Sequence, residues 1–169
     1  KRRLELMSTR DGMTGVFNRR HWETLLRNEF EACRRSHRQA TILLIDIDHF
    51  KTINDTWGHD VGDEAIVAIT RQLQLTLRAG DYIGRFGGDE FAVIMSGTPA
   101  ENAIAAMARV HERLVNMPLH GAPMARLCIS VGVAPWGAQF THYREWLKAA
   151  DVALYKAKNA GRGRTEVAA

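Results

Sequence analysis

The chain has 169 residues, of which 46% are hydrophobic, and it carries a net charge of +4 with a pI near 9.4. This length suits one well-filled domain and excludes two domains of ordinary size. The basic residues are spread along the chain, so the charge favours an anionic partner and argues against a nucleic-acid-binding protein. Cys33 and Cys128 lack metal-type spacing and are expected to be small core residues in a reducing compartment.

The first ten residues differ in character from the rest. Residues 1–10 are basic and carry the apolar Leu4 and Met7, which predicts a helical linker attached to a preceding region. Residues 11–169 are predicted to form one folded domain. Because no apolar stretch approaches the roughly 20 residues of a membrane span, membrane contact is expected only through that preceding region.

A turn punctuated by glycines opens the domain and leads into a helix. Within residues 11–20, Asn18 is placed to cap the helix that follows. Apolar residues then recur three or four positions apart, as on one face of a helix. This predicted buried face consists of Trp22, Leu26, Phe30 and Cys33.

An apolar run that ends in acids predicts the next strand. Residues 41–48 are typical of a strand buried on both faces. In an extended chain Asp46 and Asp48 point to the same side, where two carboxylates are costly unless a cation or water accompanies them. Residues 49–63 are polar and broken by glycines, which predicts a loop that could hold a ligand.

A helix is then predicted to begin at Asp63, which stands at its N-cap position, and to end near Gly80. Its buried stripe is predicted to consist of Ile66, Ile69, Leu73 and Leu77.

Two apolar runs, 81–86 and 91–95, meet at a pair of glycines and predict a β-hairpin. Gly87 and Gly88 would permit backbone torsions that other residues resist, and they leave no side chain to block a ligand. Two acids follow the glycines at once, and neighbouring acids in a tight turn repel each other. A purely structural turn gains nothing from this repulsion, so the tip of the hairpin indicates a site for a positive group.

The remaining elements are a helix, a strand and a helix. Thr98 and Glu101 predict a capping box at the start of the first of these helices. Its buried stripe is predicted to be Ile104, Met107, Val110 or His111, and Leu114. Residues 126–134 predict a strand with one well-packed face. The last helix is predicted over 143–159, with Leu147, Ala150, Leu154 and Ala157 facing inward.

This order of elements predicts an α+β fold of ferredoxin-like or polymerase-palm type, with an antiparallel sheet covered by helices. In a palm-type arrangement the end of the first strand neighbours the hairpin tip, which would gather Asp46, Asp89 and Glu90 at one spot. Carboxylates suit Mg²⁺ or Mn²⁺, and paired ions are a usual device for nucleotidyl transfer. The cations placed to oppose a phosphate tail are Lys51, Lys158 and Arg162.

The hairpin turn from Gly87 to Phe91 spells the signature of the GGDEF family, the bacterial diguanylate cyclases. Residues 11–20 also resemble the family's opening motif, D-x-L-T-G-L-x-N-R-R, with Met13 and Val16 as apolar substitutions. The resemblance implies that residues 11–169 are a GGDEF catalytic domain. Such a domain joins two GTP molecules into cyclic di-GMP and releases pyrophosphate.

The resemblance also implies roles for individual residues. Asp46, the Ile47 carbonyl and Asp89 would hold metal, and Glu90 would be a further metal contact or the base for the attacking 3′-hydroxyl. Asn54 and Asp63 would contact guanine, whose N1 and N2 hydrogens a carboxylate accepts and adenine does not offer. The phosphate contacts would be main-chain groups of His49 and Phe50 together with Lys51, Lys158 and Arg162, and Gly88 would let the nucleotide lie close to the turn.

Two further expectations follow from the family. One GTP per domain cannot supply both phosphodiester links, so the active species would be a homodimer across a two-fold axis. Arg78 and Asp81 match the family's inhibitory R-x-x-D site for cyclic di-GMP, and Arg109 aligns with a secondary arginine of that site. By themselves, Arg78 and Asp81 also suit the end of a helix and the start of a strand.

Three alternative functions are considered. A receptor without activity is disfavoured because the turn motif is intact, and a nucleic-acid-binding domain would need interleaved aromatic and basic residues. Another palm-type enzyme, a purine cyclase or a polymerase, would be separated by the products formed from GTP and from ATP. The domain is expected to lie in the cytoplasm, where a preceding region could anchor it to a membrane.

Overall fold

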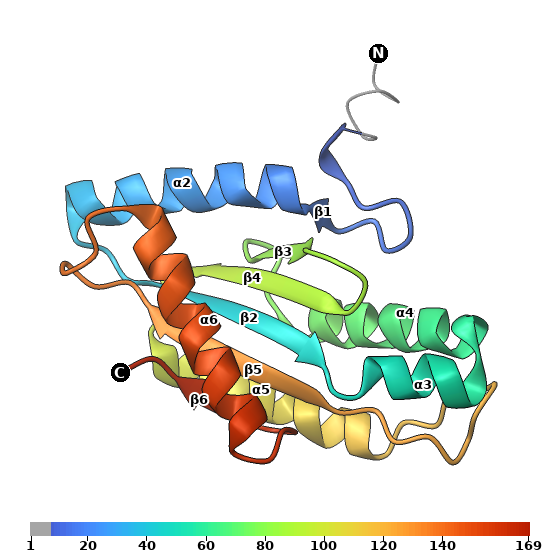
Figure 1. The fold of residues 1–169 in the computed structure, drawn as a ribbon. Coiled ribbons are helices and arrows are strands. Elements are labelled where there is room, and N and C mark those ends of the chain that lie inside the picture. The colour runs from blue at the N-terminus through green and yellow to red at the C-terminus, as the bar shows by residue number, and fades with distance from the viewer. Residues whose placement is uncertain (1–7) are drawn as a thin grey trace.

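The centre of the computed structural model, which describes residues 8–169, is a mixed six-stranded sheet (Figure 1). The strands are β1 (Phe17–Asn18), β2 (Ala40–Ile47), β3 (Tyr82–Arg85), β4 (Glu90–Ser96), β5 (Ile129–Pro135) and β6 (Thr165–Val167). Their order across the sheet is β1-β3-β4-β2-β5-β6. The inner four strands pair antiparallel, whereas the short edge strands β1 and β6 pair parallel with their neighbours.

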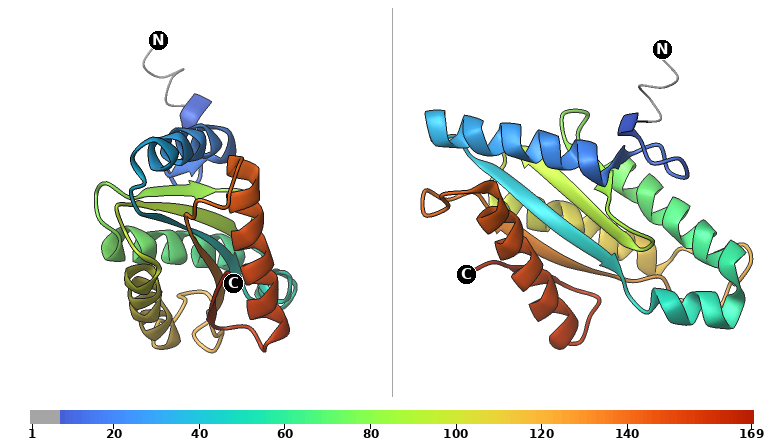
Figure 2. Two further views of the ribbon diagram at one scale, coloured as in Figure 1. Left: turned by 90° about the vertical axis from the view of Figure 1, so that its left-hand side faces the viewer. Right: turned by 45° about the horizontal axis from the view of Figure 1, so that its top comes forward.

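Helices cover both faces of this sheet, as Figure 2 shows. The helices are α2 (Arg19–Ser36), α3 (Phe50–Trp57), α4 (His59–Thr76), α5 (Ala100–Val115) and α6 (Tyr143–Asn159). One core layer lies between the sheet and α3, α4 and α5, and the other between the sheet and α2 with α6. The inner strands with α4 and α5 follow the β-α-β-β-α-β order of the predicted ferredoxin-like α+β fold, which is confirmed.

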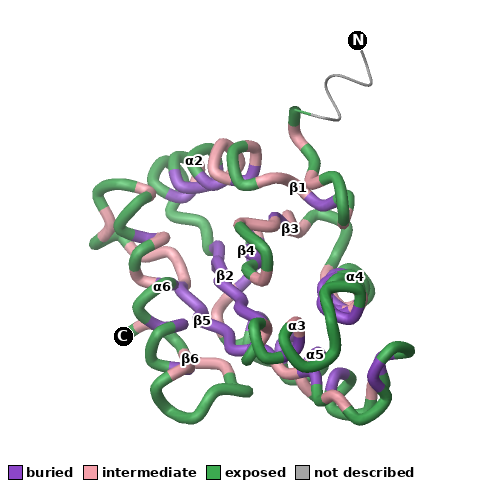
Figure 3. The backbone as a smooth tube through the Cα atoms, turned by 45° about the vertical axis from the view of Figure 1, so that its right-hand side comes forward, coloured by how far each residue is buried: buried purple, intermediate pink, exposed green. Residues whose placement is uncertain are grey.

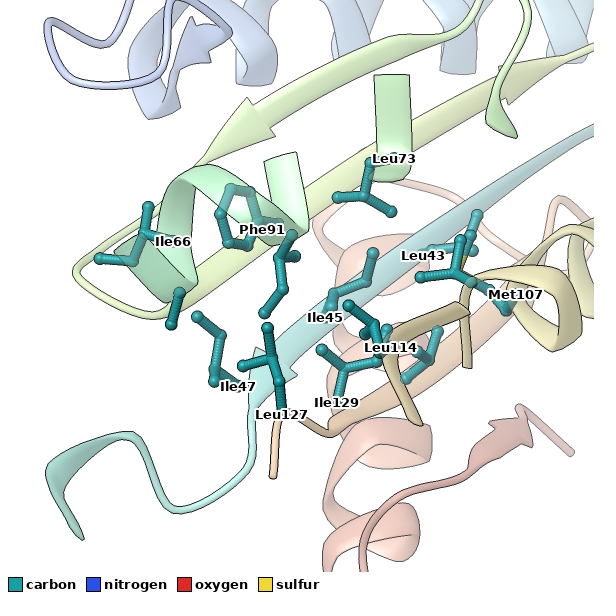
Figure 4. Packing of buried hydrophobic residues seen from close by; sticks show 14 of the residues in the cluster. Leu43, Ile45, Ile47, Ile66, Leu73, Phe91, Met107, Leu114, Leu127 and Ile129 are labelled. Carbon is teal, nitrogen blue, oxygen red and sulfur yellow. The ribbon is translucent and has the colours of Figure 1, made fainter. Parts of the chain in front are cut away.

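Strand β2 supplies side chains to both core layers. Leu43, Ile45 and Ile47 pack with α3, α4 and α5, as Figure 4 shows for their neighbourhood, while Ile42 and Leu44 pack toward α2 and α6. This alternation follows from the two-residue period of a strand. Every residue of β2 is buried, so the strand is enclosed from end to end (Figure 3).

Two helices confirm their predictions closely. The side chain of Asn18 accepts a hydrogen bond from the His21 backbone N–H and caps α2. The predicted stripe of α2, from Trp22 to Cys33, is fully buried. Helix α6 spans the predicted residues 143–159.

The predicted loop over 49–63 is wrong, because most of it is helical. Phe50 and Ile53 lie three residues apart and pack against the core, so burial of an apolar edge outweighs the polar composition of α3. Gly58, with φ of 95°, separates α3 from α4. Helix α4 therefore begins at His59, and Asp63 lies inside it rather than at its N-cap. The helix ends at Thr76, before the predicted Gly80.

The predicted capping box at Thr98 is also wrong. Pro99 is the N-cap of α5, and its side chain makes no capping hydrogen bond. The Thr98 hydroxyl does not cap the helix, because it donates to the Ser96 carbonyl and accepts from Arg78. The predicted stripe of α5 is confirmed at Met107, Val110 and Leu114, whereas Ile104 is exposed and Ala103 is buried in its place.

Strand β5 is buried on both faces rather than on one. Its second face carries Ser130 and Gly132, and α6 lies directly on it. A Cβ atom at Gly132 would stand 2.3 Å from the Ala150 carbonyl oxygen and 2.3 Å from the Leu154 nitrogen. The absence of a side chain at this position therefore lets the backbone of α6 approach the sheet.

The predicted linker falls largely outside the described residues. Leu4 and Met7, on which that prediction depends, belong to residues 1–7, and the described part begins with Ser8. Between residues 8 and 169, no helix has the length and apolar character of a transmembrane span.

Candidate active site

The end of β2 and the tip of the β3–β4 hairpin meet, as the sequence predicts. Asp46 lies opposite Glu90 in the antiparallel register of β2 and β4. The Ile47 backbone N–H donates to the Asp89 carbonyl at 3.0 Å, which continues the ladder past the end of β4. Residues separated by more than forty positions in the chain therefore lie together at the same end of two neighbouring inner strands.

Asp46 is the buried acid of this site. It is 7% exposed and forms an ion pair with Lys158, which projects from the last turn of α6. Its second carboxylate oxygen, Oδ1, is buried and has no hydrogen-bond partner among the described residues. A buried, unpaired carboxylate oxygen costs free energy unless another positive group satisfies it.

Asp89 adjoins Asp46. Partial burial, together with the neighbouring Asp46 and Glu90 carboxylates, raises the pKa of Asp89 to about 6. Glu90 itself is exposed. Among residues 8–169, no three His, Cys, Asp or Glu side chains converge to enclose a metal. The predicted gathering of three carboxylates is thus met in part: Asp46 adjoins Asp89, whereas Glu90 is exposed.

The raised pKa of Asp89 predicts how stability depends on pH. Below pH 3.8 the carboxyl is protonated in the folded and unfolded chains alike. As pH rises from 3.8 to about 6, the unfolded chain releases this proton first, so the free energy of unfolding falls. We expect metal-free Asp89→Asn to melt a few degrees above the wild type at pH 8. The gap should shrink toward pH 4, as thermal denaturation across this range would show; an equal gap at every pH would contradict the assignment.

Asp48 serves a neighbouring turn rather than the site itself. Its Oδ1 accepts from the Ser130 hydroxyl at 2.6 Å, and its Oδ2 accepts from the Gly163 N–H at 2.7 Å. These bonds fix the turn after α6, where Arg162 has a left-handed φ of 64°. Arg162 donates back to the Lys158 carbonyl, so both predicted phosphate-binding cations belong to one anchored segment.

The predicted phosphate site begins where β2 passes into α3. His49 takes a left-handed conformation with φ of 55°, and α3 starts at Phe50. The first backbone N–H groups of a helix have no intrahelical acceptor and suit a phosphate. Lys51, in the first turn of α3, is 90% exposed and pairs with Asp55 one turn later.

The two predicted guanine contacts lie on adjoining helices. Asn54 is partly buried in α3, and its side-chain oxygen has no hydrogen-bond partner among the described residues. A Cβ at Gly62 of α4 would fall 1.8 Å from that oxygen, so the two helices touch at Asn54. Asp63, the next residue of α4, is exposed.

The backbone torsions predicted to require glycine at Gly87 and Gly88 are not found. Neither has a positive φ, so the turn does not need torsions reserved for glycine. A Cβ at either position would meet nothing within 4 Å, which leaves open space above the turn. Close approach of a ligand to the backbone at these glycines stays a prediction.

Arg85 supports this turn, a role that is not among those predicted from the sequence. Its Nη2 donates to the Gly88 carbonyl at 2.9 Å, and its Nη1 pairs with Asp11 at 3.2 Å. Asp11 also accepts from the Thr14 backbone and hydroxyl, and these bonds with the Arg85 charge lower its pKa although burial opposes them. The opening turn and the hairpin tip are thus tied together. Two features of the sequence could have indicated this contact: a cation two residues before the glycines and an acid in the opening motif.

The predicted product site has internal bonds of its own. The Asp81 carboxylate accepts from the Arg78 backbone N–H at 2.9 Å, and burial raises the pKa of Asp81. The Arg78 guanidinium donates to Ser96 and Thr98. Both residues line a cavity of about 430 Å³ beside β1. Arg109 lies elsewhere, on a groove between α4 and α5.

Comparison with known proteins gives a consistent result. Residues 8–164 match the sequence family described as "Diguanylate cyclase, GGDEF domain". The chain is 76% identical over 169 residues to the Probable diguanylate cyclase DgcC of Escherichia coli K12, covering 100% of this chain and 46% of that protein. It is 38% identical over 162 residues to the Response regulator PleD of Caulobacter vibrioides NA1000, covering 94% and 36% respectively. The chain thus spans less than half the length of these relatives.

Solved structures resemble the fold over nearly its whole length. The coiled coil and GGDEF domain of DgcB from Caulobacter crescentus, in complex with c-di-GMP, aligns with a TM-score of 0.93 at 25% identity. That alignment covers 99% of this chain and 89% of the other. Diguanylate cyclase SiaD from Pseudomonas aeruginosa, in complex with its activator SiaC, aligns with a TM-score of 0.88 at 35% identity, covering 98% and 65%.

Proposed function

Because the chain belongs to the GGDEF-domain family of diguanylate cyclases, we propose that it condenses two GTP molecules into cyclic di-GMP with release of pyrophosphate. The observation that carries this proposal is the meeting of Asp46 with Asp89 and Glu90 at one edge of the sheet. Carboxylates brought together from the end of β2 and the hairpin tip are the kind of ligand that the paired ions of a nucleotidyl-transfer site would need.

The residues present fit a divalent cation of the Mg²⁺ or Mn²⁺ kind. Asp46 Oδ1 is a buried oxygen with no hydrogen-bond partner within residues 8–169, and Asp89 is a carboxylate whose raised pKa a neighbouring cation would lower. Asp46, the Ile47 carbonyl and Asp89 would hold the metal, with remaining ligands from the nucleotide. When bound, paired ions stabilise the attacking and leaving oxygens of phosphoryl transfer. Glu90, exposed at the rim, would receive the proton of the attacking 3′-hydroxyl.

The other site residues would bind and orient GTP. Asn54 and Asp63 would recognise guanine, while Lys51, Lys158 and Arg162 would neutralise the phosphates beside the N-terminus of α3. Main-chain groups at His49 and Phe50 would approach the phosphates, and the open space at Gly88 would admit the nucleotide.

The chemistry calls for two copies of the domain. A single site holds one GTP, whereas the product has two phosphodiester links, so each copy would present its nucleotide to the other across a two-fold axis. Arg78 and Asp81 would bind cyclic di-GMP as an inhibitor through the cavity beside β1, with Arg109 as a further contact reached from the neighbouring groove. The domain would work in the cytoplasm, within a longer protein that a preceding region could anchor to a membrane.

The test is product formation from GTP with Mg²⁺, followed by chromatography, with ATP as the matched substrate. We expect cyclic di-GMP from GTP at a rate that rises faster than linearly with protein, and no cyclic dinucleotide from ATP. Product from ATP, or GTP binding with no product at any protein concentration, would contradict the proposal.

The guanine contact gives a further prediction. Asp63→Asn exchanges an acceptor-only carboxylate for an amide that also donates, so guanine loses a charged hydrogen bond. Since such a bond contributes about 1.5–3 kcal/mol, the KM for GTP should rise about tenfold or more. Initial rates at several GTP concentrations measure this change. Glu31→Gln, which neutralises an exposed acid on α2, should leave the KM unchanged.

A further inference from the structure

A cavity of about 340 Å³ adjoins the candidate active site, and Glu90 is the one residue with a proposed catalytic role among those that line it. It lies on the face covered by α2 and α6 and reaches Glu90. Its floor is apolar, with Leu44, Phe86, Leu147 and Leu154. Its rim carries the three cations Arg19, Arg144 and Lys148 and the two acids Glu90 and Asp151.

The positive charge of this rim is only partly neutralised. Arg19 pairs with Glu23 and lies over the Phe86 ring, and Lys148 stands 3.7 Å from Asp151. Arg144 is exposed, and among residues 8–169 no carboxylate lies within ion-pair distance of it. The rim therefore suits an acidic group that belongs to another molecule.

The opposite flank of the active site has the complementary character. We define the α3–α4 corner as residues 57–63, where α3 ends and α4 begins. Trp57 is 41% exposed there. Asp60 and Asp63 are exposed, and no cation in the described part of the chain pairs with Asp60. The corner thus presents an aromatic side chain beside unpaired acids.

The end of β2 lies between these two surfaces. Figure 1 shows α6 on one side of it and α3 with α4 on the other, and the second panel of Figure 2 agrees. A two-fold axis that lies in the plane of contact and runs perpendicular to the line from α6 to the α3–α4 corner exchanges these two flanks. The cationic cavity of one copy would then face the acidic corner of its partner, and the reverse contact would occur at the other end.

From this geometry we infer that the cavity of one copy receives the α3–α4 corner of a second copy in the catalytic dimer. Arg144 and Lys148 contact Asp60 of the partner subunit, and the partner's Trp57 lies on the apolar floor. A cavity of about 150 Å³ already holds benzene, so an indole ring fits this larger one. The inference deepens the proposed function, since it assigns the surfaces that align two GTP-loaded domains.

The test combines charge reversal with nucleotide-dependent association. 3′-Deoxy-GTP lacks the attacking hydroxyl, so it loads the site without reaction, and sedimentation velocity then reports self-association of the loaded chain. Arg144→Glu and Asp60→Arg should each weaken association about tenfold, as expected for loss of a close charge pair. The double variant restores opposite charges and should recover to within about threefold of the wild type. Lys156→Glu makes the same charge change on α6 away from the cavity and should have no effect.

Affinity for 3′-deoxy-GTP by the single domain should be unchanged in every variant, whereas cyclic di-GMP formation at low protein concentration should follow the association constants. Unaltered association in both single variants, or a double variant as weak as either, would overturn the inference even if the wild type makes cyclic di-GMP. A wild type that makes no product would contradict the proposed function instead, and the association measurements would still decide the contact.

Discussion

Asp46→Asn should reduce cyclic di-GMP formation by about 10³-fold or more. The substitution keeps the shape of the side chain but removes the buried charge that pairs with Lys158 and offers Oδ1 to a cation. Losing a metal ligand removes several kcal/mol of transition-state stabilisation, and about 1.4 kcal/mol corresponds to a factor of ten. The measurement is the initial rate from GTP with saturating Mg²⁺ at one protein concentration.

Two controls separate lost chemistry from lost structure. Glu31→Gln also removes one carboxylate and should retain the wild-type rate. The circular dichroism spectrum of Asp46→Asn should match the wild type, because the strand around it is held by both neighbouring strands. A folded Asp46→Asn chain with a wild-type rate would show that Asp46 is not a metal ligand.

Gly132→Ala should destabilise the domain by about 3 kcal/mol, near the upper end of ordinary overpacking. The added methyl group would collide with backbone atoms of Ala150 and Leu154, which cannot rotate away as a side chain could. The melting temperature should therefore fall by about 6–12 °C, at about 2–4 °C per kcal/mol for a chain of this size. Differential scanning calorimetry measures the shift.

The same substitution should also lower cyclase activity below the melting temperature. Helix α6 must move away from β5, and it carries Lys158 to the active site. Gly12→Ala is the matched control, because a Cβ there meets nothing within 4 Å and its φ is not positive. If Gly132→Ala melted with the wild type, the close approach of α6 to the sheet would be refuted.

Much of the fold could be predicted because strong local patterns agree with the tertiary packing. The unbroken apolar run of β2 and the capped stripe of α2 leave few alternatives. The polar helix α3 was missed because its burial rests on Phe50 and Ile53 alone, too few for a visible period. The edge strands β1 and β6 have two and three residues and arise from pairing with distant partners.

The contacts of the candidate site likewise include some that the sequence predicts and some that it does not. The approach of Asp46 to Asp89 and Glu90 follows from strand order and could be predicted. The pairing of Asp46 with Lys158 depends on how closely α6 approaches the sheet. Gly132 permits this close approach, and no local sequence pattern predicts it. The Arg85 bridge from Asp11 to Gly88 joins residues far apart in the chain, so single-sequence patterns do not show it.

The ion pair between Lys158 and Asp46 means that the site carries its own exchangeable counterion. A divalent cation bound at Asp46, as proposed, would compete with an ammonium group tethered to the end of α6. Each exchange would free that ammonium beside the turn that Asp48 anchors, where an incoming phosphate would bind it. Binding of metal and of nucleotide would thereby be linked through one lysine, so that each should raise the apparent affinity for the other.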